Sequence, residues 1–299
     1  MAEYAPLTCD WDMSDCRPCE RSLCFRLATL LNRRLPRGKG AVPRFLGRNL
    51  GKPLRYFMTT RAGNRLAIEP GSFDMYASMM NEGGVWSQRV FEVCASLLSA
   101  GRVFFDIGAN VGYLSIEMAG AFADAVRVVA FEPQPALAQA VAASARINGF
   151  GNVSVFELML GDRVGAAELF LTSHSGHASA KPGDERHSTL ARRIVTLDQL
   201  VESGVIPAPD VIKIDVEGAE YAVLSGARET LARHRPSIVF ESNGNEKRFG
   251  YSRADLLELV GGIAPYEFHF IDDAGGFVRI GAENLSAAYE DILARPIRP

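Results

Sequence analysis

An apolar strand that runs into a glycine turn is the feature that most constrains the fold of this 299-residue chain. Residues 103–112 read Val-Phe-Phe-Asp-Ile-Gly-Ala-Asn-Val-Gly, and residues 113–121 have the composition of a helix. Gly108 and Gly112 would let the backbone approach a ligand, because a Cβ atom there would clash or forbid the required φ. The positive end of the helix would face the same crevice. Such a unit predicts a parallel α/β sheet that binds an adenosine-containing cofactor.

A second acid bears on the choice of cofactor. The next predicted strand ends at Phe131 and is followed by Glu132, which could accept hydrogen bonds from both ribose hydroxyls of a nucleoside. Both NAD enzymes and S-adenosylmethionine (SAM) enzymes bind the ribose with an acid at this position, so Glu132 does not distinguish between the two cofactors. The turn lacks the third glycine of a dinucleotide fingerprint, and its Asp106 and Asn110 would repel or crowd a pyrophosphate. These two side chains suit a methionine moiety, so the turn favours SAM.

Several sequence blocks in a fixed order resemble the FkbM-type family of SAM-dependent methyltransferases. The most distinctive block is Lys-Ile-Asp-Val-Glu-Gly-Ala-Glu at residues 213–220. The others are the glycine turn at 105–112, Phe-Glu-Pro-Gln-Pro at 131–135, Asn148, Asn-Val at 152–153 and Val-Leu-Ser-Gly-Ala at 223–227. The joint match covers roughly residues 85–245 and is much more specific than the glycine turn alone.

The resemblance implies a cofactor site at the ends of the first three strands. The residues that would surround the methionine end are Asp106, Gly108, Asn110 and Gly112. Glu132 would bind the ribose. Asp162 follows the third strand, where family members often contact adenine, although a simple turn aspartate is an alternative for this residue.

Strands and helices alternate along most of the chain. The predicted strands are near residues 103–106, 127–131, 153–157, 211–215, 237–241, 266–271 and 277–280, with short strands between 56 and 70. The predicted helices are 85–98, 113–121, 135–147, 217–233 and 252–261. This alternation predicts an α/β fold with a doubly wound parallel sheet and a ligand at the carboxyl ends of its strands. The resemblance implies a seven-stranded, mostly parallel, Rossmann-like sheet of the class I methyltransferase type, with the pair 266–271 and 277–280 supplying its antiparallel last strand.

Methyl transfer from a sulfonium is an in-line displacement, in which a protein aligns the reactants and excludes water. A hydroxyl acceptor also needs a base. Asp215, at the end of the fourth strand, is one candidate, and capping of the next helix is its alternative role. Glu217 and His177 are the others, although His177 also reads as a plain histidine of a polar loop. Lys213 lies inside a buried strand and needs a partner, which we expect to be one of these acids.

The chain divides into an N-terminal extension, residues 1–50, and a methyltransferase domain, residues 51–299, whose core is about residues 85–245. The extension carries Cys9, Cys16, Cys19 and Cys24, whose spacing is not that of a standard zinc site. A disordered tail with free thiols is the favoured interpretation, and a metal or cluster site is the alternative. No metal is predicted for the catalytic site.

Residues 21–48 mix arginines with leucines, as in a basic amphipathic helix. Such a helix either makes a weak peripheral contact with an anionic membrane or an acidic partner, or packs on the catalytic domain with its basic face in solvent; the second interpretation is favoured. The net charge of −3 gives no reason to expect a nucleic acid partner. The sequence contains no apolar run of transmembrane length and no secretory signal, so we expect a cytoplasmic enzyme.

We therefore predict a SAM-dependent O-methyltransferase. The acceptors that the resemblance implies are hydroxyls of sugars and of natural products. An NAD-dependent oxidoreductase and a non-catalytic binding module with a degenerate methyltransferase fold are the two alternatives.

Overall fold

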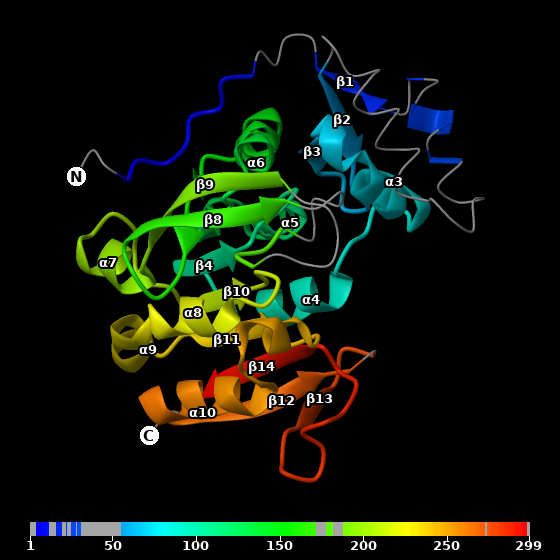
Figure 1. Ribbon diagram of the computed structural model, residues 1–299. Coiled ribbons are helices and arrows are strands. Elements are labelled where there is room, and N and C mark those ends of the chain that lie inside the picture. Colours follow the sequence, from blue (N-terminus) through cyan, green and yellow to red (C-terminus); the bar gives the residue numbers. More distant parts are fainter. Residues whose placement is uncertain are drawn as a thin grey trace.

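A computed structural model describes residues 4–11, 16–19, 22, 25–27, 29–30, 55–171, 178–181, 188–272 and 274–297 of the chain. Its centre is an eight-stranded sheet in the order β13-β12-β14-β11-β10-β4-β5-β6 (Figure 1). These strands are β4 (Arg102–Ile107), β5 (Val126–Phe131), β6 (Val153–Phe156), β10 (Val211–Ile214), β11 (Ser237–Glu241), β12 (Tyr266–Ile271), β13 (Phe277–Arg279) and β14 (Asp291–Pro296). The four pairings that join β6, β5, β4, β10 and β11 are all parallel, which confirms the predicted α/β class.

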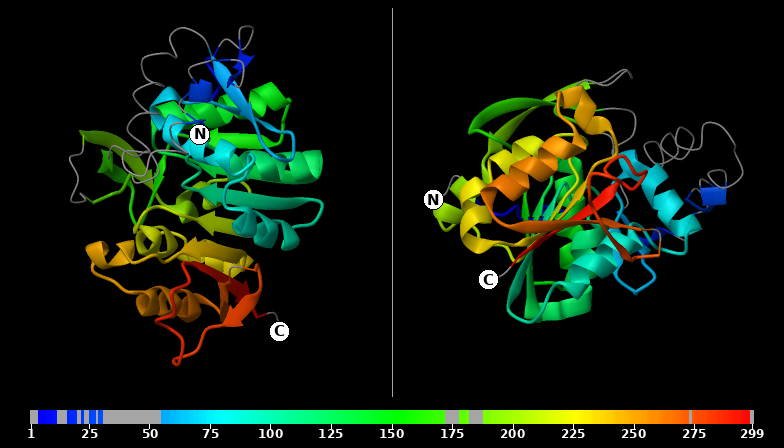
Figure 2. Two further views of the ribbon diagram at one scale, coloured as in Figure 1. Left: turned by 90° about the vertical axis from the view of Figure 1, so that its right-hand side faces the viewer. Right: turned by 90° about the horizontal axis from the view of Figure 1, so that it is seen from below.

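Helices cover both faces of this sheet (Figure 2). One layer contains α4 (Gln88–Ser96), α5 (Tyr113–Phe122) and α6 (Pro135–Asn148), and the other contains α7 (Leu197–Glu202), α8 (Glu220–Ser225), α9 (Arg228–His234) and α10 (Arg253–Ile263). Alternation along the strands explains the two layers, since successive side chains point to opposite faces. Phe104 packs with residues of α4 and α5, whereas its neighbour Phe105 packs with residues of α7 to α10. Both phenylalanines are fully buried.

The antiparallel part of the sheet differs from the prediction. The strand that lies antiparallel beside β11 is β14, which sits between β11 and β12. β13 pairs with the outer side of β12. Because β14 adds to the seven predicted strands, the sheet has eight. The middle residues of β14 are buried on both faces, so apolar and polar residues do not alternate along it. Periodicity alone cannot identify such a short apolar run as a strand.

Two connections also differ from the prediction. No strand was predicted between β6 and β10, but this segment contains a hairpin of β8 (Gly165–Leu171) and β9 (Ser188–Val195), joined by β7 (Met159–Leu160) into a second sheet. The expected polar loop with His177 falls between β8 and β9 in the sequence, mostly outside the described residues. The predicted helix 217–233 is split into α8 and α9 at Gly226. A Cβ atom on Gly226 would run into the backbone carbonyl of Gly161, so the close packing of these two loops requires the glycine.

A small N-terminal unit packs beside α5 and α6. It consists of β1 (Arg17–Pro18), β2 (Tyr56–Thr59), β3 (Arg65–Ala67) and α3 (Phe73–Asn81). Glu117 of α5 anchors it, since its buried carboxylate accepts hydrogen bonds from Thr60 Oγ1 at 2.6 Å and from Asn64 Nδ2 at 3.0 Å. This unit places α3 and the segment before α4 over the carboxyl edge of the large sheet.

The described parts of the extension are packed, which corrects the expectation of a disordered tail. The Leu7 N–H donates to the carbonyl of Val155 in β6 at 2.7 Å, and Trp11 is buried with alanines of α6. Phe25 is also buried, and the centroid of its ring lies 4.2 Å from the ring centroid of Phe73. Residues 31–54 lie outside the described residues. No helix in the part of the chain that the structure describes is long and apolar enough to cross a membrane.

Candidate active site

Two neighbouring cavities open at the carboxyl edge of the parallel strands. The larger has a volume of about 660 Å³ and lies over β4, β10 and β11, between them and the segment 74–90. The smaller, about 80 Å³, lies beside the ends of β5 and β7. Four residues line both cavities, and we call them the junction residues: Gly108, Asn110, Asp215 and Glu217. Ligands bind at this edge in doubly wound sheets because the strand ends and helix starts leave a crevice there.

The β4–α5 turn supplies the floor of the larger cavity. Asp106 is fully buried; its Oδ2 accepts a hydrogen bond from Ser115 Oγ at 2.6 Å, and its Oδ1 has no hydrogen-bond partner among the described residues. Asn110 has a φ of +52° and a buried Oδ1 that also lacks a partner in the described structure. Such strained backbone and unsatisfied polar atoms occur preferentially at functional sites.

The two predicted glycines are needed for packing within the protein. Both have positive φ, +79° at Gly108 and +81° at Gly112. A Cβ atom on Gly108 would run into the carbonyl oxygen of Asp215, and one on Gly112 would lie 2.8 Å from Val141 Cγ2 of α6. Gly108 therefore lets the end of β10 approach the turn closely, which brings Asp215 beside it.

Lys213 links β10 to the turn. Its Nζ lies 3.3 Å from Asp215 Oδ2 and 3.6 Å from Asp106 Oδ1, and it donates to the carbonyl of Gly108 at 3.2 Å. This arrangement confirms the expectation that the buried lysine pairs with acids of the site. Burial opposes its charge, but Asp215 and Asp106 outweigh that effect and hold the pKa of Lys213 above its ordinary value.

Glu132 lines the smaller cavity at the end of β5. It is buried, and its two carboxylate oxygens accept the N–H groups of Asn110 at 2.8 Å and Gln134 at 2.9 Å. Burial raises the pKa of Glu132 to about 7, although these hydrogen bonds act in the opposite direction. Because each oxygen has a second lone pair, the oriented carboxylate can accept further hydrogen bonds from a ligand.

Glu217 lies in the turn between β10 and α8, not in the helix where it was expected. Its φ is +55°, and its Oε2 accepts a hydrogen bond from Asn245 Nδ2 at 2.7 Å. Burial and the neighbouring charges of Asp215 and Glu220 raise the pKa of Glu217 to about 8. Glu220 has a structural role, since its Oε1 accepts the N–H groups of Val216 and Gly218.

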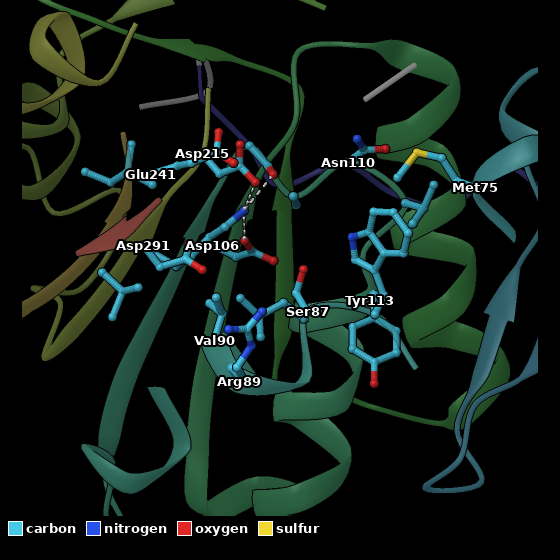
Figure 3. A pocket seen from close by; sticks show the side chains of 18 of the residues that line it. Met75, Ser87, Arg89, Val90, Asp106, Asn110, Tyr113, Asp215, Glu241 and Asp291 are labelled. Atoms are coloured by element: carbon cyan, nitrogen blue, oxygen red, sulfur yellow. Dashed lines mark hydrogen bonds and ion pairs between the residues drawn. The ribbon is translucent and has the colours of Figure 1, made fainter. Parts of the chain in front are cut away.

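Asp215 does not cap α8, whose N-cap is Ala219. Its side chain is 40% exposed and lines both cavities beside Lys213 (Figure 3).

Five of the described acidic residues that line the larger cavity were missed by the sequence analysis, and two of them, Glu241 and Asp291, lie on the large sheet. Glu241 ends β11, and Asp291 starts β14 directly opposite it in the sheet register. Burial and nearby carboxylates, Asp215 first among them, hold the pKa of Glu241 well above its ordinary value and raise that of Asp291 to about 6. A signal for Glu241 was available, because, like Glu132 and Asp215, it stands where a parallel strand ends. The sequence offered no comparable signal for Asp291, since β14 was not predicted.

Two of the predicted cofactor residues, Gly112 and Asp162, line neither cavity. Asp162 is exposed and pairs with Arg163 at 3.0 Å. His177 lies outside the described residues. Among the residues that are described, no group of three or more His, Cys, Asp or Glu side chains is placed to hold a metal ion.

A model of the methyltransferase FkbM domain matches residues 106–274, more than half of the chain. A hexuronic acid methyltransferase, AglP, from Haloferax volcanii is 33% identical to it over 139 residues. That alignment covers 43% of this chain and 51% of the relative, so the chain spans about half the length of the curated relative that it matches.

Solved structures overlap with part of the chain. A methyltransferase FkbM from Methylobacillus flagellatus is 17% identical with a TM-score of 0.46, and the overlap covers 75% of this chain and 54% of that one. A SAM-dependent O-methyltransferase from Thermotoga maritima is 12% identical with a TM-score of 0.41, covering 81% and 78% of the two chains.

Proposed function

Because the chain belongs to the methyltransferase FkbM domain family, we propose that it transfers a methyl group from SAM to a hydroxyl of a sugar or natural-product acceptor. The observation that carries this proposal is the pair of cavities that meet at Gly108, Asn110, Asp215 and Glu217. A donor in the smaller cavity and an acceptor in the larger one would bring their reacting atoms together at these junction residues. Alignment of this kind is the main contribution a protein makes to methyl transfer.

The residues around the smaller cavity fit a nucleoside. Glu132 offers an oriented carboxylate to two ribose hydroxyls, and the apolar side chains of Leu158 and Met159 suit an adenine ring. The cavity volume of about 80 Å³ is smaller than a nucleoside, so binding requires these side chains to move apart. Met159 can do so readily, because its unbranched side chain has several rotatable bonds.

The turn fits the methionine end of SAM. Asn110 Oδ1 is a buried acceptor without a hydrogen bond among the described residues, and an ammonium would satisfy an acceptor of this kind. Asp106 Oδ1 also lacks a hydrogen bond there, but it is ion-paired with Lys213. SAM, when bound, supplies an electrophilic methyl group on a sulfonium. Asp215 places a carboxylate near that end of the cavities.

Glu217 is the base that this arrangement favours. Its Oε2 is held by Asn245, and its Oε1 has no hydrogen bond in the described structure, so Oε1 can receive the proton of an acceptor hydroxyl. A carboxylate with a pKa of about 8 is a stronger base than an ordinary one. Asp215 is ion-paired with Lys213, which favours a role in holding charge rather than in moving a proton. The catalytic role of His177 stays a prediction, as does the cytoplasmic location.

A sugar acceptor is supported by the relative from Haloferax volcanii, which is named a hexuronic acid methyltransferase. The larger cavity has room for such a ring, since cavities of about 300–1,000 Å³ hold small-molecule ligands.

The proposal is tested by calorimetric titration of the full chain with SAM, S-adenosylhomocysteine and NADH, followed by a screen of sugar and natural-product acceptors for transfer of labelled methyl. Micromolar binding of the two sulfur nucleosides and no binding of NADH is the expected result. Binding of NADH alone would revive the oxidoreductase hypothesis. Binding of the sulfur nucleosides without transfer to any acceptor would favour the non-catalytic module.

A further inference from the structure

The larger cavity has two chemically different walls (Figure 3). Asp215, Glu241 and Asp291 lie on one side of it, and Met75 and Tyr113 on the other. We call Glu217, Glu241 and Asp291 the carboxylate wall, and Met75, Trp86 and Tyr113 the apolar wall. The carboxylate wall lies at the ends of β10 and β11 and at the start of β14, whereas α3 and the segments before α4 and at the start of α5 supply the apolar wall.

The charges that line this cavity are unbalanced. Of the described lining residues, eight are Asp or Glu, and two, Arg89 and Lys213, are cationic. Lys213 is already paired with Asp106 and Asp215, and the Arg89 guanidinium donates to the carbonyl of Asp272. SAM would add a single net positive charge, because its sulfonium and ammonium outnumber its carboxylate by one. Even with Glu217 and Glu241 protonated at neutral pH, the other six lining acids outnumber these three positive charges, so a surplus of negative charge remains on the acceptor side.

The carboxylate wall is held in place by hydrogen bonds. Asn245 Nδ2 donates to Glu217 Oε2 at 2.7 Å, and Asn243 Nδ2 donates to Glu241 Oε2 at 2.8 Å. Within the described structure the other oxygen of each carboxylate has no hydrogen bond, so both side chains are oriented by a neutral amide and neither is neutralised by a cation. Burial is the main cause of the raised pKa values of Glu217 and Glu241, and repulsion from neighbouring carboxylates, Asp215 first among them, adds to it. A bound cation would relieve that repulsion, and a bound anion would increase it.

The apolar wall fits the same kind of ligand. Aromatic faces such as those of Trp86 and Tyr113 attract cations and also pack against the apolar face of a ring. The opposite wall accepts hydrogen bonds from hydroxyl and ammonium groups.

From these two walls we infer that the acceptor is a hydroxylated cation, namely a polyhydroxylated ring with a protonated amino group that lies against Glu241 and Asp291. The inference rests on the proposed function for the identity of the cavity as the acceptor site. The expected acceptor differs in charge from a hexuronic acid, the acid named for the relative, because an acidic sugar would be repelled by the carboxylates of this cavity.

The test compares three sugars of similar size and different charge: glucosamine, glucose and glucuronate. Each is titrated into the full chain at neutral pH, with and without saturating S-adenosylhomocysteine, and binding is followed by calorimetry and by ligand-observed NMR. The wild-type chain is expected to bind glucosamine about tenfold or more tighter than glucose, and glucuronate more weakly than either. Glu241→Gln should reduce the ratio between glucosamine and glucose several-fold. Glu258→Gln, which removes the same charge from the exposed face of α10, should leave the ratio unchanged.

Equal binding of the three sugars, no binding of glucosamine, or a preference for glucuronate would overturn the inference. Failure of S-adenosylhomocysteine to bind would instead overturn the proposed function. Because the sugars are also titrated alone, the two failures are distinguishable. A glucosamine preference that Glu241→Gln leaves intact would mean that the cation binds elsewhere, which also overturns the inference.

Discussion

Lys213 of β10 stands directly opposite Asp106 of β4 in the register of two neighbouring parallel strands, with Nζ 3.6 Å from Oδ1. Asp106 is fully buried and the Lys213 side chain is only 13% exposed, so each charge depends on the other and on Asp215. The pair holds the β4–α5 turn against the end of β10, where the two cavities meet.

Removing one partner of this pair should destabilise the fold. Lys213→Met leaves the charge of Asp106 buried without its cation, and we expect a loss on the order of 3–5 kcal/mol in the free energy of unfolding. Urea denaturation measures this loss. The double variant Lys213→Met/Asp106→Asn removes both charges and should recover part of the stability. Equal stability of the single and double variants would contradict the proposed dependence of each charge on the other.

Glu132→Gln should weaken binding of S-adenosylhomocysteine. An amide keeps the size of the carboxylate but loses its charge and one acceptor, so it cannot accept from the N–H groups of Asn110 and Gln134 and from both ribose hydroxyls. A hydrogen bond to a charged group contributes about 1.5–3 kcal/mol, which corresponds to roughly 10- to 150-fold in affinity. Calorimetry provides the measurement, with Glu258→Gln as the matched control. Unchanged affinity in a folded Glu132→Gln protein would exclude the ribose role.

The activity should rise with pH if Glu217 is the base. Its pKa is raised to about 8, so the carboxylate form that accepts a proton grows as the pH increases through that value. The kcat/KM for the donor, which reports ionisations of the free enzyme, should therefore increase from pH 7 to pH 9 and then level off. Glu217→Gln should lower kcat about 10²- to 10⁴-fold and remove this rise.

Asp215→Asn distinguishes the two candidate bases. It removes the carboxylate that faces Glu217, so the inflection should move to lower pH while the rise itself remains. Loss of the entire pH dependence in Asp215→Asn, with its retention in Glu217→Gln, would assign the base to Asp215 instead.

Gly108 and Gly149 form a matched pair for testing the turn. Both have positive φ, +79° and +72°, but only a Cβ atom on Gly108 would meet another part of the chain, the carbonyl of Asp215. Gly149→Ala should cost about 1–2 kcal/mol from left-handed backbone strain alone. Gly108→Ala should cost more and should also weaken S-adenosylhomocysteine binding, because β10 must move away from the turn. Equal thermal shifts and unchanged binding in both variants would rule out this close approach.

Local sequence was sufficient for the parallel half of the sheet and for much of the site. The strands that contain Phe105, Phe131 and Ile214 are apolar runs bounded by turn signals, so their positions could be read within one or two residues. Asp106, Glu132 and Asp215 were found because an acid that follows such a strand, or stands at its end, faces the crevice of a parallel sheet. The roles of these residues in binding stay predictions.

Only the tertiary structure decided what surrounds those residues. Asp291 joins the site because β14 runs antiparallel beside β11, which is a pairing between segments 50 residues apart in the chain and leaves no local signal. Trp86 and Met75 reach the larger cavity because the N-terminal unit is anchored on α5 through Glu117. Local pattern determines where strands and turns form, since it depends on neighbours in sequence. The charge balance and the shape of the cavity depend on which distant segments pack together, so only the tertiary structure determines them.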